Sequence, residues 1–183
     1  LMDADKENMK TVALAATQPV REDHQYSWRK KEMEEHDFVR RHIENVMAQN
    51  DCKLETSKGP YTIESGRVAH LKTEYDFKKA PSTNIRNIIH QLHPTPAIGG
   101  EPVKAALDCI SEVEGYSRNY YTGYIGEVND RQQTRLYINL RCMQIDDHQI
   151  AMYVGGGISA DSNANEEWDE TIQKSLTMRQ VWD

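Results

Sequence analysis

The sequence predicts an α+β fold in which an antiparallel β-sheet carries helices packed on its outside. Three observations favour this class: amphipathic stretches free of glycine and proline, β-branched segments with alternating polarity, and short turn sequences that join the last strands in order. A chain of 183 residues is long enough to bury a hydrophobic core. We find no internal repeat, low-complexity tract or linker, so residues 1–183 are expected to form one compact unit.

Residues 11–79 predict a strand, a long helix and a hairpin. "TVALAAT" (11–17) is typical of a short buried strand and is ended by Gln18-Pro19. Residues 28–49 predict a helix, because apolar side chains recur every three to five positions; these are Met33, Phe38, Ile43, Val46 and Met47. Residues 59–79 alternate as strands do, with a turn at Ser65-Gly66.

The rest of the chain predicts three further helices and three strands. A helix over 82–93 would be capped by Ser82 or Thr83, and "LHPTPAIGGEP" (92–102) is too rich in proline and glycine for an ordinary helix or strand. The remaining predicted elements are a helix over 101–115, strands over 120–129, 134–146 and 149–157 that form an antiparallel meander, and a closing helix over 164–181.

Charge and composition exclude several classes of partner. The formal net charge is −7, and no run of basic residues is longer than "RKK" at 29–31, so we expect no nucleic-acid binding. No stretch of about 18 apolar residues is present, so we expect no membrane span. The three cysteines lie far apart without metal-binding spacing, which favours a reducing, cytoplasmic location.

Two helices each present a pair of carboxylates one turn apart. Glu32 and Glu35 share a face of the first long helix, and Glu167 and Glu170 share a face of the last. Brought together, the two faces would form an oxygen-rich site suited to Mg²⁺, which is usually held by one or two carboxylates plus water and substrate oxygens. An ordinary solvated helix face explains the same spacing.

Three other features could bind an anion. Gly155-Gly156-Gly157 leaves backbone N–H groups open, although a close backbone approach explains the glycines as well. Arg141 lies in the apolar strand "LYINLRC", where it either faces solvent or meets a carboxylate. Lys174 follows Glu170 by four residues and is ordinarily its helix-surface partner. Together they could form a pocket for a small dicarboxylate.

Several stretches, in order, resemble the motifs of chorismate-binding enzymes, in particular the isochorismate synthases of menaquinone and siderophore pathways. They span residues 11–178 and read "TVALAATQP", "KKEMEEHDFV", "VAHLKT", "LHPTPAIGGEP", "YYTGYIG", "NLRC" and "YVGGGISADSNANEEWDET". The resemblance implies that the chain supplies part of a two-sheet fold with helices outside. It also implies chorismate or isochorismate as the ligand.

The resemblance implies a Mg²⁺-dependent reaction in which water attacks C2 of chorismate and the C4 hydroxyl leaves. Glu35 and Glu170 would bind the metal, with Glu32 and Glu167 supporting it. Further roles are implied for matching positions: Arg141, Tyr121 and a backbone N–H of Gly155 or Gly156 at the enolpyruvyl carboxylate, Lys174 and the backbone of Ala16 and Thr17 near the ring carboxylate, and His70 near the departing hydroxyl.

Two positions favour the branch of the family that uses water as its nucleophile. Ala97 stands where the ammonia-using anthranilate synthases of the family typically carry a threonine. The resemblance implies that Ala97 forms a wall of the pocket and leaves room for water. Ala15 stands where aminodeoxychorismate synthases carry a lysine. Salicylate synthase, which goes on to expel pyruvate, and other chorismate-utilising enzymes are remaining alternatives.

The chain also departs from the family pattern. The lysine that serves as general base and the glutamate that serves as general acid would both precede Leu1, so the resemblance implies a C-terminal portion that binds weakly and lacks turnover by itself. We expect the N-terminal half of the enzyme as a partner and self-association of this chain without it. A non-catalytic binding or regulatory paralogue is the alternative. Ala16 replaces the usual glycine.

Overall fold

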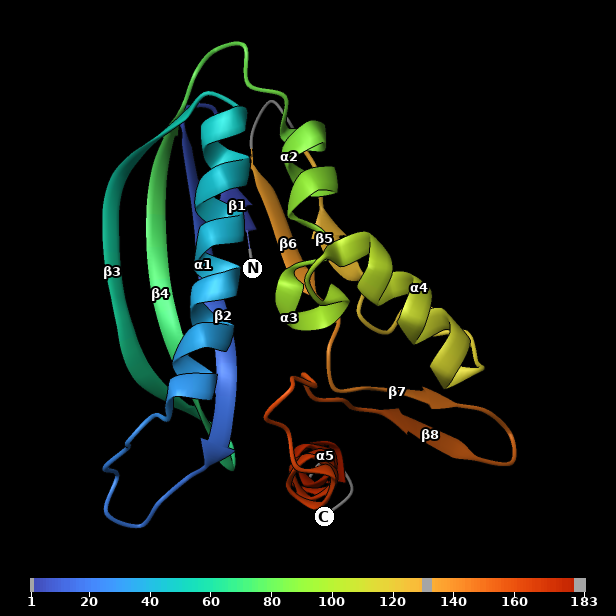
Figure 1. Ribbon diagram of the computed structural model, residues 1–183. Coiled ribbons are helices and arrows are strands. Elements are labelled where there is room, and N and C mark those ends of the chain that lie inside the picture. The colour runs from blue at the N-terminus through green and yellow to red at the C-terminus, as the bar shows by residue number, and fades with distance from the viewer. Residues whose placement is uncertain (1, 130–132, 180–183) are drawn as a thin grey trace.

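The computed structural model describes residues 2–129 and 133–179, and it confirms the α+β class. Helices α1 to α4 lie on one side of the main sheet, and the β7–β8 ribbon and α5 lie beyond its lower end (Figure 1). The elements are β1 (Met2–Ala4), β2 (Asn8–Pro19), α1 (Lys30–Gln49), β3 (Cys52–Ser65), β4 (Val68–Lys79), α2 (Ile85–Leu92), α3 (Pro96–Gly99), α4 (Val103–Glu114), β5 (Tyr124–Glu127), β6 (Thr134–Ile138), β7 (Cys142–Ile145), β8 (Ile150–Tyr153) and α5 (Ala164–Arg179).

The main sheet has six strands in the order β3-β4-β2-β1-β6-β5, and every described pairing is antiparallel. The short strand β1 was not predicted. It joins β2 on one side and β6 on the other, pairing Met2 with Thr11 and with Leu136. Three residues are too few to show a period, and the pairing with β6 depends on a contact distant in sequence.

The hairpin of β3 and β4 has its turn after Ser65, as predicted, but β3 begins earlier, at Cys52. Its first half is polar and exposed, so it lacks the alternation that reveals a strand. Gly59 allows β3 to cross β4 closely. A Cβ atom there would lie 2.6 Å from the Lys72 carbonyl oxygen, and its φ of 135° suits glycine.

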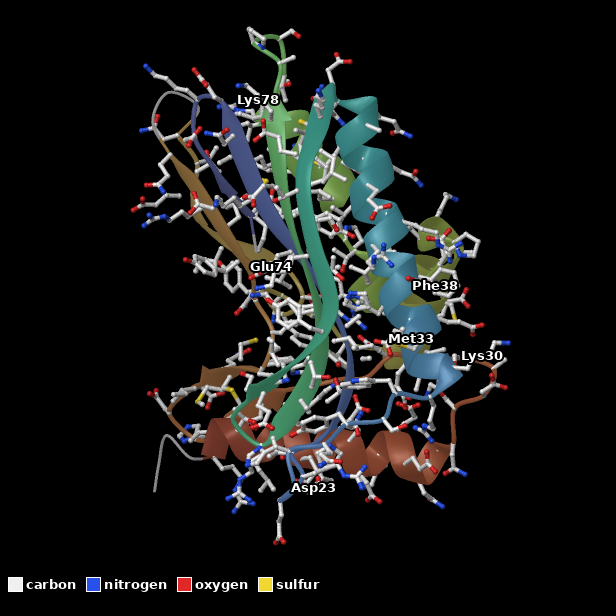
Figure 2. All side chains as sticks on the ribbon, turned by 90° about the vertical axis from the view of Figure 1, so that its left-hand side faces the viewer. Asp23, Lys30, Met33, Phe38, Glu74 and Lys78 are labelled. Carbon is white, nitrogen blue, oxygen red and sulfur yellow. The ribbon has the colours of Figure 1, made fainter. Side chains whose placement is uncertain are left out.

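Helix α1 packs on β2, β3 and β4. In the first part of the helix, the buried face differs from the predicted one. Ile43, Val46 and Met47 are buried as predicted, but Met33 and Phe38 are 37% and 44% exposed. Figure 2 labels both on α1. Glu32 and His36 take the buried positions instead. The prediction for Met33 and Phe38 was wrong because buried polar side chains occupy that face.

The segment from residue 80 to 115 forms three helices on the α1 side of the sheet. Asn84, rather than Ser82 or Thr83, caps α2, because its side chain accepts hydrogen bonds from the N–H groups of Arg86 and Asn87. The rigid stretch 92–102 contains a single helical turn, α3. Pro102 caps α4, which ends at the left-handed Gly115.

The predicted strand over 134–146 is two strands in two different sheets. β6 belongs to the main sheet, whereas β7 pairs with β8 in a separate two-stranded ribbon. Arg141 lies between them with a left-handed φ of 50°, so it is not a strand residue and the three-stranded meander was wrong. This backbone turn takes the chain out of the main sheet, and hydrophobicity alone does not reveal it.

The core lies between α1, α2 and the sheet. Its buried apolar residues are Met2, Ala4, Met9, Ala13, Ala15, Val39, Ile43, Val46, Met47, Cys52, Tyr75, Phe77, Ile85, Ile88, Ile89 and Leu136. The other face of β4 is charged: Lys72 pairs with Glu74, and Asp76 pairs with Lys10 of β2 (Figure 2 labels Glu74 and Lys78). Among the described residues, no helix is both long and apolar enough to cross a membrane.

Candidate functional site

Two neighbouring cavities lie where the ends of β2 and β4 meet α1, the β7–β8 ribbon and α5. The arginine cavity, about 380 Å³, is lined by Arg118, Arg141 and Lys174 together with Tyr121 and His70. The carboxylate cavity, about 390 Å³, is lined by acidic side chains of α1 and α5, which are Glu32, Glu35, Glu166, Glu167, Asp169 and Glu170. Both cavities are lined by Thr17, Glu35 and Gly157, so they meet there.

His70 on β4 joins Ala16 to Arg141. Its Nδ1 lies 2.9 Å from the Ala16 carbonyl oxygen, which can only accept, and its Nε2 lies 3.0 Å from Arg141 Nη2, which can only donate. The ring is therefore neutral, with its proton on Nδ1. Burial lowers the pKa of His70, and burial also lowers the pKa of Arg141.

Ala16 lies in a bulge of β2, where the pairing with β4 shifts between Ala15 and Gln18. Its φ is 64°, a left-handed value that is unusual for a residue other than glycine. This conformation turns the Ala16 N–H towards α1, where it donates to Glu35 Oε1 at 3.3 Å. The bulge thus connects Glu35 of the carboxylate cavity to His70 of the arginine cavity.

Tyr121 and Arg118 form another wall of the arginine cavity. The Arg118 guanidinium binds both carboxylate oxygens of Glu114, donates to the Ile98 carbonyl oxygen at 3.4 Å and lies 5.7 Å from the centre of the Tyr121 ring. The Tyr121 hydroxyl approaches the ribbon so closely that a Cβ atom on Gly155 would lie 2.8 Å from it. A side chain at position 155 would therefore force the Tyr121 hydroxyl to move.

Most carboxylates of the second cavity already have a cation as partner. Arg29 Nη2 lies 2.6 Å from Glu32 Oε1, and Lys31 Nζ lies 2.5 Å from Glu167 Oε1. Lys174 Nζ lies 2.6 Å from Glu170 Oε1 and 2.8 Å from the Gly155 carbonyl oxygen. Burial alone would raise the pKa of Glu167, but the hydrogen bonds from Lys31 and Ser162 lower it.

Glu35 is held differently, by the neutral N–H of Ala16. Burial raises the pKa of Glu35; the Ala16 hydrogen bond opposes this rise, and the negative charge of Glu170 adds to it. The negative charge of Glu170 therefore repels that of Glu35. A cation between them would relieve this repulsion.

The glycine backbone provides the space beside these carboxylates. A Cβ atom on Gly156 would lie 3.2 Å from Glu167 Oε2 and 3.5 Å from Glu170 Oε1, and one on Gly157 would lie 3.7 Å from Glu35 Oε1. Three carboxylates of α1 and α5 therefore face one short stretch of backbone. Within residues 2–129 and 133–179, no three acidic, histidine or cysteine side chains are gathered closely enough to hold a metal ion.

Known proteins resemble this chain in sequence and in fold. Residues 1–182 match the family model described as "Chorismate binding enzyme". The chain belongs to the chorismate-binding enzyme family. Isochorismate synthase EntC of Escherichia coli K12 is 29% identical over 152 residues, and isochorismate synthase MenF of Bacillus subtilis is 32% identical over 148 residues.

These matches cover most of the chain but a minor part of each relative. They include 83% of this chain and 39% of EntC, and 81% of this chain and 31% of the Bacillus protein. The solved structure of the menaquinone-specific isochorismate synthase MenF from Escherichia coli matches the whole chain with a TM-score of 0.85 and 23% identity, over 44% of its own length. This last match shows the shared chorismate-binding fold.

The structure gathers every predicted site residue around the two cavities. The arginine cavity includes Ala16, Thr17, Glu35, His70, Ala97, Tyr121, Arg141, Gly155, Gly156 and Lys174. The carboxylate cavity includes Glu32, Glu167 and Glu170. Ala97 also borders a third, largely apolar cavity of about 290 Å³ under α2 and α3, so it stands between two hollows.

The sequence did not predict the side chains that hold the predicted site residues in position. Arg118 and Glu114 support Tyr121 and the wall at Ile98, and Arg29 and Lys31 hold Glu32 and Glu167. Arg118 lies three residues before Tyr121, next to the stretch that resembles the family. Lys31 lies within the family motif "KKEMEEHDFV", but its pairing with Glu167 could not be predicted, because the two residues are 136 positions apart.

Proposed function

We propose that this chain is the metal-binding and substrate-binding portion of an isochorismate synthase, which converts chorismate to isochorismate. Its relatives EntC and MenF are named isochorismate synthases, and one structural observation gives the proposal its main support. The two cavities meet at Glu35 and Gly157, with the cations Arg141 and Lys174 on one side and Glu35 and Glu170 facing glycine backbone on the other. That arrangement suits a dicarboxylate bound next to a divalent cation.

Mg²⁺ is the cation that the proposal places there, and the residues fit it. Glu35 and Glu170 offer hard oxygen donors, a small number of protein ligands is usual for Mg²⁺, and Gly156 and Gly157 leave room for water and substrate oxygens. The metal would neutralise the ring carboxylate and fix its orientation. Glu32 and Glu167, each held by a cation, would support the bound waters.

The remaining contacts follow from the arginine cavity. In the proposal Arg141, Tyr121 and an N–H of Gly155 or Gly156 bind the enolpyruvyl carboxylate. Lys174 and the backbone of Ala16 and Thr17 lie near the ring carboxylate. His70 lies near the departing C4 hydroxyl, and its hydrogen bond at Nε2 also orients Arg141 towards the substrate.

The reaction adds the oxygen of water at C2 and expels the C4 hydroxyl, so one proton leaves the water and one joins the leaving group. Neutral His70 already uses both ring nitrogens, at Ala16 and Arg141. We assign the base and the acid to the lysine and glutamate of the family pattern, and we place them in the part of the relatives that this chain does not cover. Residues 1–183 tested by themselves should therefore show no turnover.

The test is chorismate conversion followed by chromatography, with and without Mg²⁺, for this chain and for a longer chain read from the gene upstream of Leu1. The longer chain should form isochorismate and lose this activity on Glu35→Gln or Glu170→Gln. Glu34→Gln is the matched control, because Glu34 is exposed on the same helix and pairs with Lys30 at 3.5 Å. Activity that survives both cavity substitutions would refute the metal assignment.

Two other outcomes would redirect the proposal. Salicylate and pyruvate as primary products would make the protein a salicylate synthase, and a genuine start codon near Met2 would favour the non-catalytic paralogue. The proposal also includes a cytoplasmic location, which the three free cysteines Cys52, Cys109 and Cys142 support.

A further inference from the structure

Lys174 occupies the border between the two cavities. Its side chain is only 12% exposed and lines the arginine cavity together with Arg141. Its ammonium nevertheless binds Glu170 Oε1 at 2.6 Å, and Glu170 lines the carboxylate cavity. The Gly155 carbonyl oxygen, at 2.8 Å, binds the same ammonium from the segment that follows β8. Lys174 thus contacts the proposed metal ligand and borders the proposed substrate space at once.

Three of the four carboxylates of the proposed metal site pair with cations of the chain. Lys174 holds Glu170, Lys31 holds Glu167 and Arg29 holds Glu32. In the described parts of the chain, no three acidic, histidine or cysteine side chains gather closely enough to hold a metal ion. The two ion pairs at Glu32 and Glu167 involve supporting residues, whereas the pair at Glu170 involves a proposed direct ligand.

We propose that Lys174 is the counter-ion of Glu170 while the metal is absent, and that the metal takes the place of Lys174 at Glu170. The released ammonium then binds a carboxylate of the substrate. The inference rests on the proposed function. An ammonium 2.6 Å from the coordinating oxygen would repel a divalent cation on the same oxygen, so both cannot keep that position. The bond to Gly155 lets Lys174 remain at the cavity after it leaves Glu170.

The exchange also balances charge in a useful order. Glu35, Glu170, Lys174 and Arg141 together carry no net charge when all are ionised, which offers little attraction to a dianion. Once a divalent cation joins them, the group carries two positive charges, which favours a dicarboxylate. The structure therefore predicts that the metal binds before the substrate, or together with it.

The first test is calorimetric titration of Mg²⁺ alone into the 183-residue chain and into its Lys174→Met variant. The variant should bind Mg²⁺ about fivefold more tightly, since a competing partner has been removed from Glu170. Lys174→Arg, which keeps the positive charge, should bind like the wild type. The matched control is Lys104→Met, because Lys104 forms an exposed pair with Asp108 at the same four-residue spacing, 3.7 Å apart on α4. This control should leave Mg²⁺ binding unchanged.

The second test uses the wild-type chain, so it does not depend on how a variant folds. Acetylation by an N-hydroxysuccinimide ester is followed at each lysine by mass spectrometry. Adding Mg²⁺ should speed acetylation of Lys174, which loses its ion pair, and leave Lys104 unaffected.

The outcomes separate this inference from the proposed function. If Glu170→Gln abolishes Mg²⁺ binding but Lys174→Met binds no better than wild type, and Mg²⁺ leaves Lys174 acetylation unchanged, the metal site stands and the exchange is wrong. If neither the wild type nor Lys174→Met binds Mg²⁺, the metal assignment fails and the exchange fails with it.

Discussion

Ala16 adopts a backbone conformation that costs a residue with a Cβ atom roughly 1–2 kcal/mol. The two hydrogen bonds of its peptide groups, to Glu35 and from His70, hold it there. The strain lies at the point where the two cavities meet, which is where strained residues tend to be found in functional sites.

We predict that Ala16→Gly keeps or raises the free energy of unfolding, by up to about 1 kcal/mol, because the left-handed strain disappears while glycine adds freedom to the unfolded chain. Ala13→Gly is the matched control. Ala13 is fully buried in the same strand and is not among the positive-φ residues of the described chain, so glycine there should lower stability. Urea unfolding followed by circular dichroism measures both. A loss at position 16 equal to that at position 13 would contradict the strain.

His36 makes stability depend on pH. It is fully buried on α1, its Nε2 lies 2.8 Å from Thr73 Oγ1, and burial lowers its pKa to about 4, with Arg40 lowering it further and Asp37 opposing. The unfolded chain, with a histidine pKa near the reference 6.5, takes up the proton first as pH falls. The contribution of His36 is therefore complete above pH 6.5 and is lost towards pH 4.

Between pH 7 and pH 5 this amounts to about 2 kcal/mol of unfolding free energy. His36→Gln should remove that part of the pH dependence, whereas His90→Gln, on the exposed side of α2, should keep the wild-type slope. Denaturant unfolding at both pH values compares the three proteins. Equal slopes for wild type and His36→Gln would show that His36 is already protonated in the folded chain.

At the scale of elements, neighbouring side chains limit which residues fit in the segment after β8. Gly155 faces the Tyr121 hydroxyl, whereas Gly157 has only ordinary space beside Glu35. We predict that Gly155→Ala lowers the free energy of unfolding by about 1–3 kcal/mol, because a Cβ atom would overlap a tyrosine packed among Arg118 and Tyr153. Gly157→Ala should change it by about 0.5 kcal/mol or less. Thermal and urea unfolding give the comparison, and equal effects would contradict the close contact.

The elements that the sequence predicted well are those stabilised by neighbours along the chain. The end of α1 and the Ser65 turn follow from periodicity and turn chemistry, and the family motifs contain most of the residues that line the two cavities. Contacts distant in sequence decided the rest. Met33 is exposed because the buried Glu32 is held by Arg29 beside it, and the break at Arg141 depends on a left-handed backbone that hydrophobicity does not encode.

At the scale of the whole molecule, the two outer strands of the main sheet differ. β3 carries lysine and glutamate along its exposed edge, a composition that discourages pairing between molecules. β5 at the opposite edge is "YIGE", and its Ile125 is 67% exposed. The expected self-association should therefore use β5.

We predict that the 183-residue chain associates with rising concentration and that Ile125→Lys weakens this association. Leu54→Lys is the matched control, because Leu54 is an exposed apolar residue on β3, the other outer strand. Sedimentation velocity over a range of concentrations measures the effect. A purely monomeric wild-type chain, or an equal effect of both lysines, would refute a role for the β5 edge.

The position of β1 has a consequence for how the protein is made. β1 lies between β2 and β6, and its partners Leu136 and Thr134 enter the chain more than a hundred residues after Met2 and Ala4. During synthesis at the ribosome, β2, β3 and β4 can pair early, while the far side of β1 stays open until β6 has emerged. In a nascent chain the pairing of β1 with β6, in the middle of the sheet, therefore forms last. The speed of translation between residues 80 and 134 sets how long the open edge of β1 is exposed to other chains.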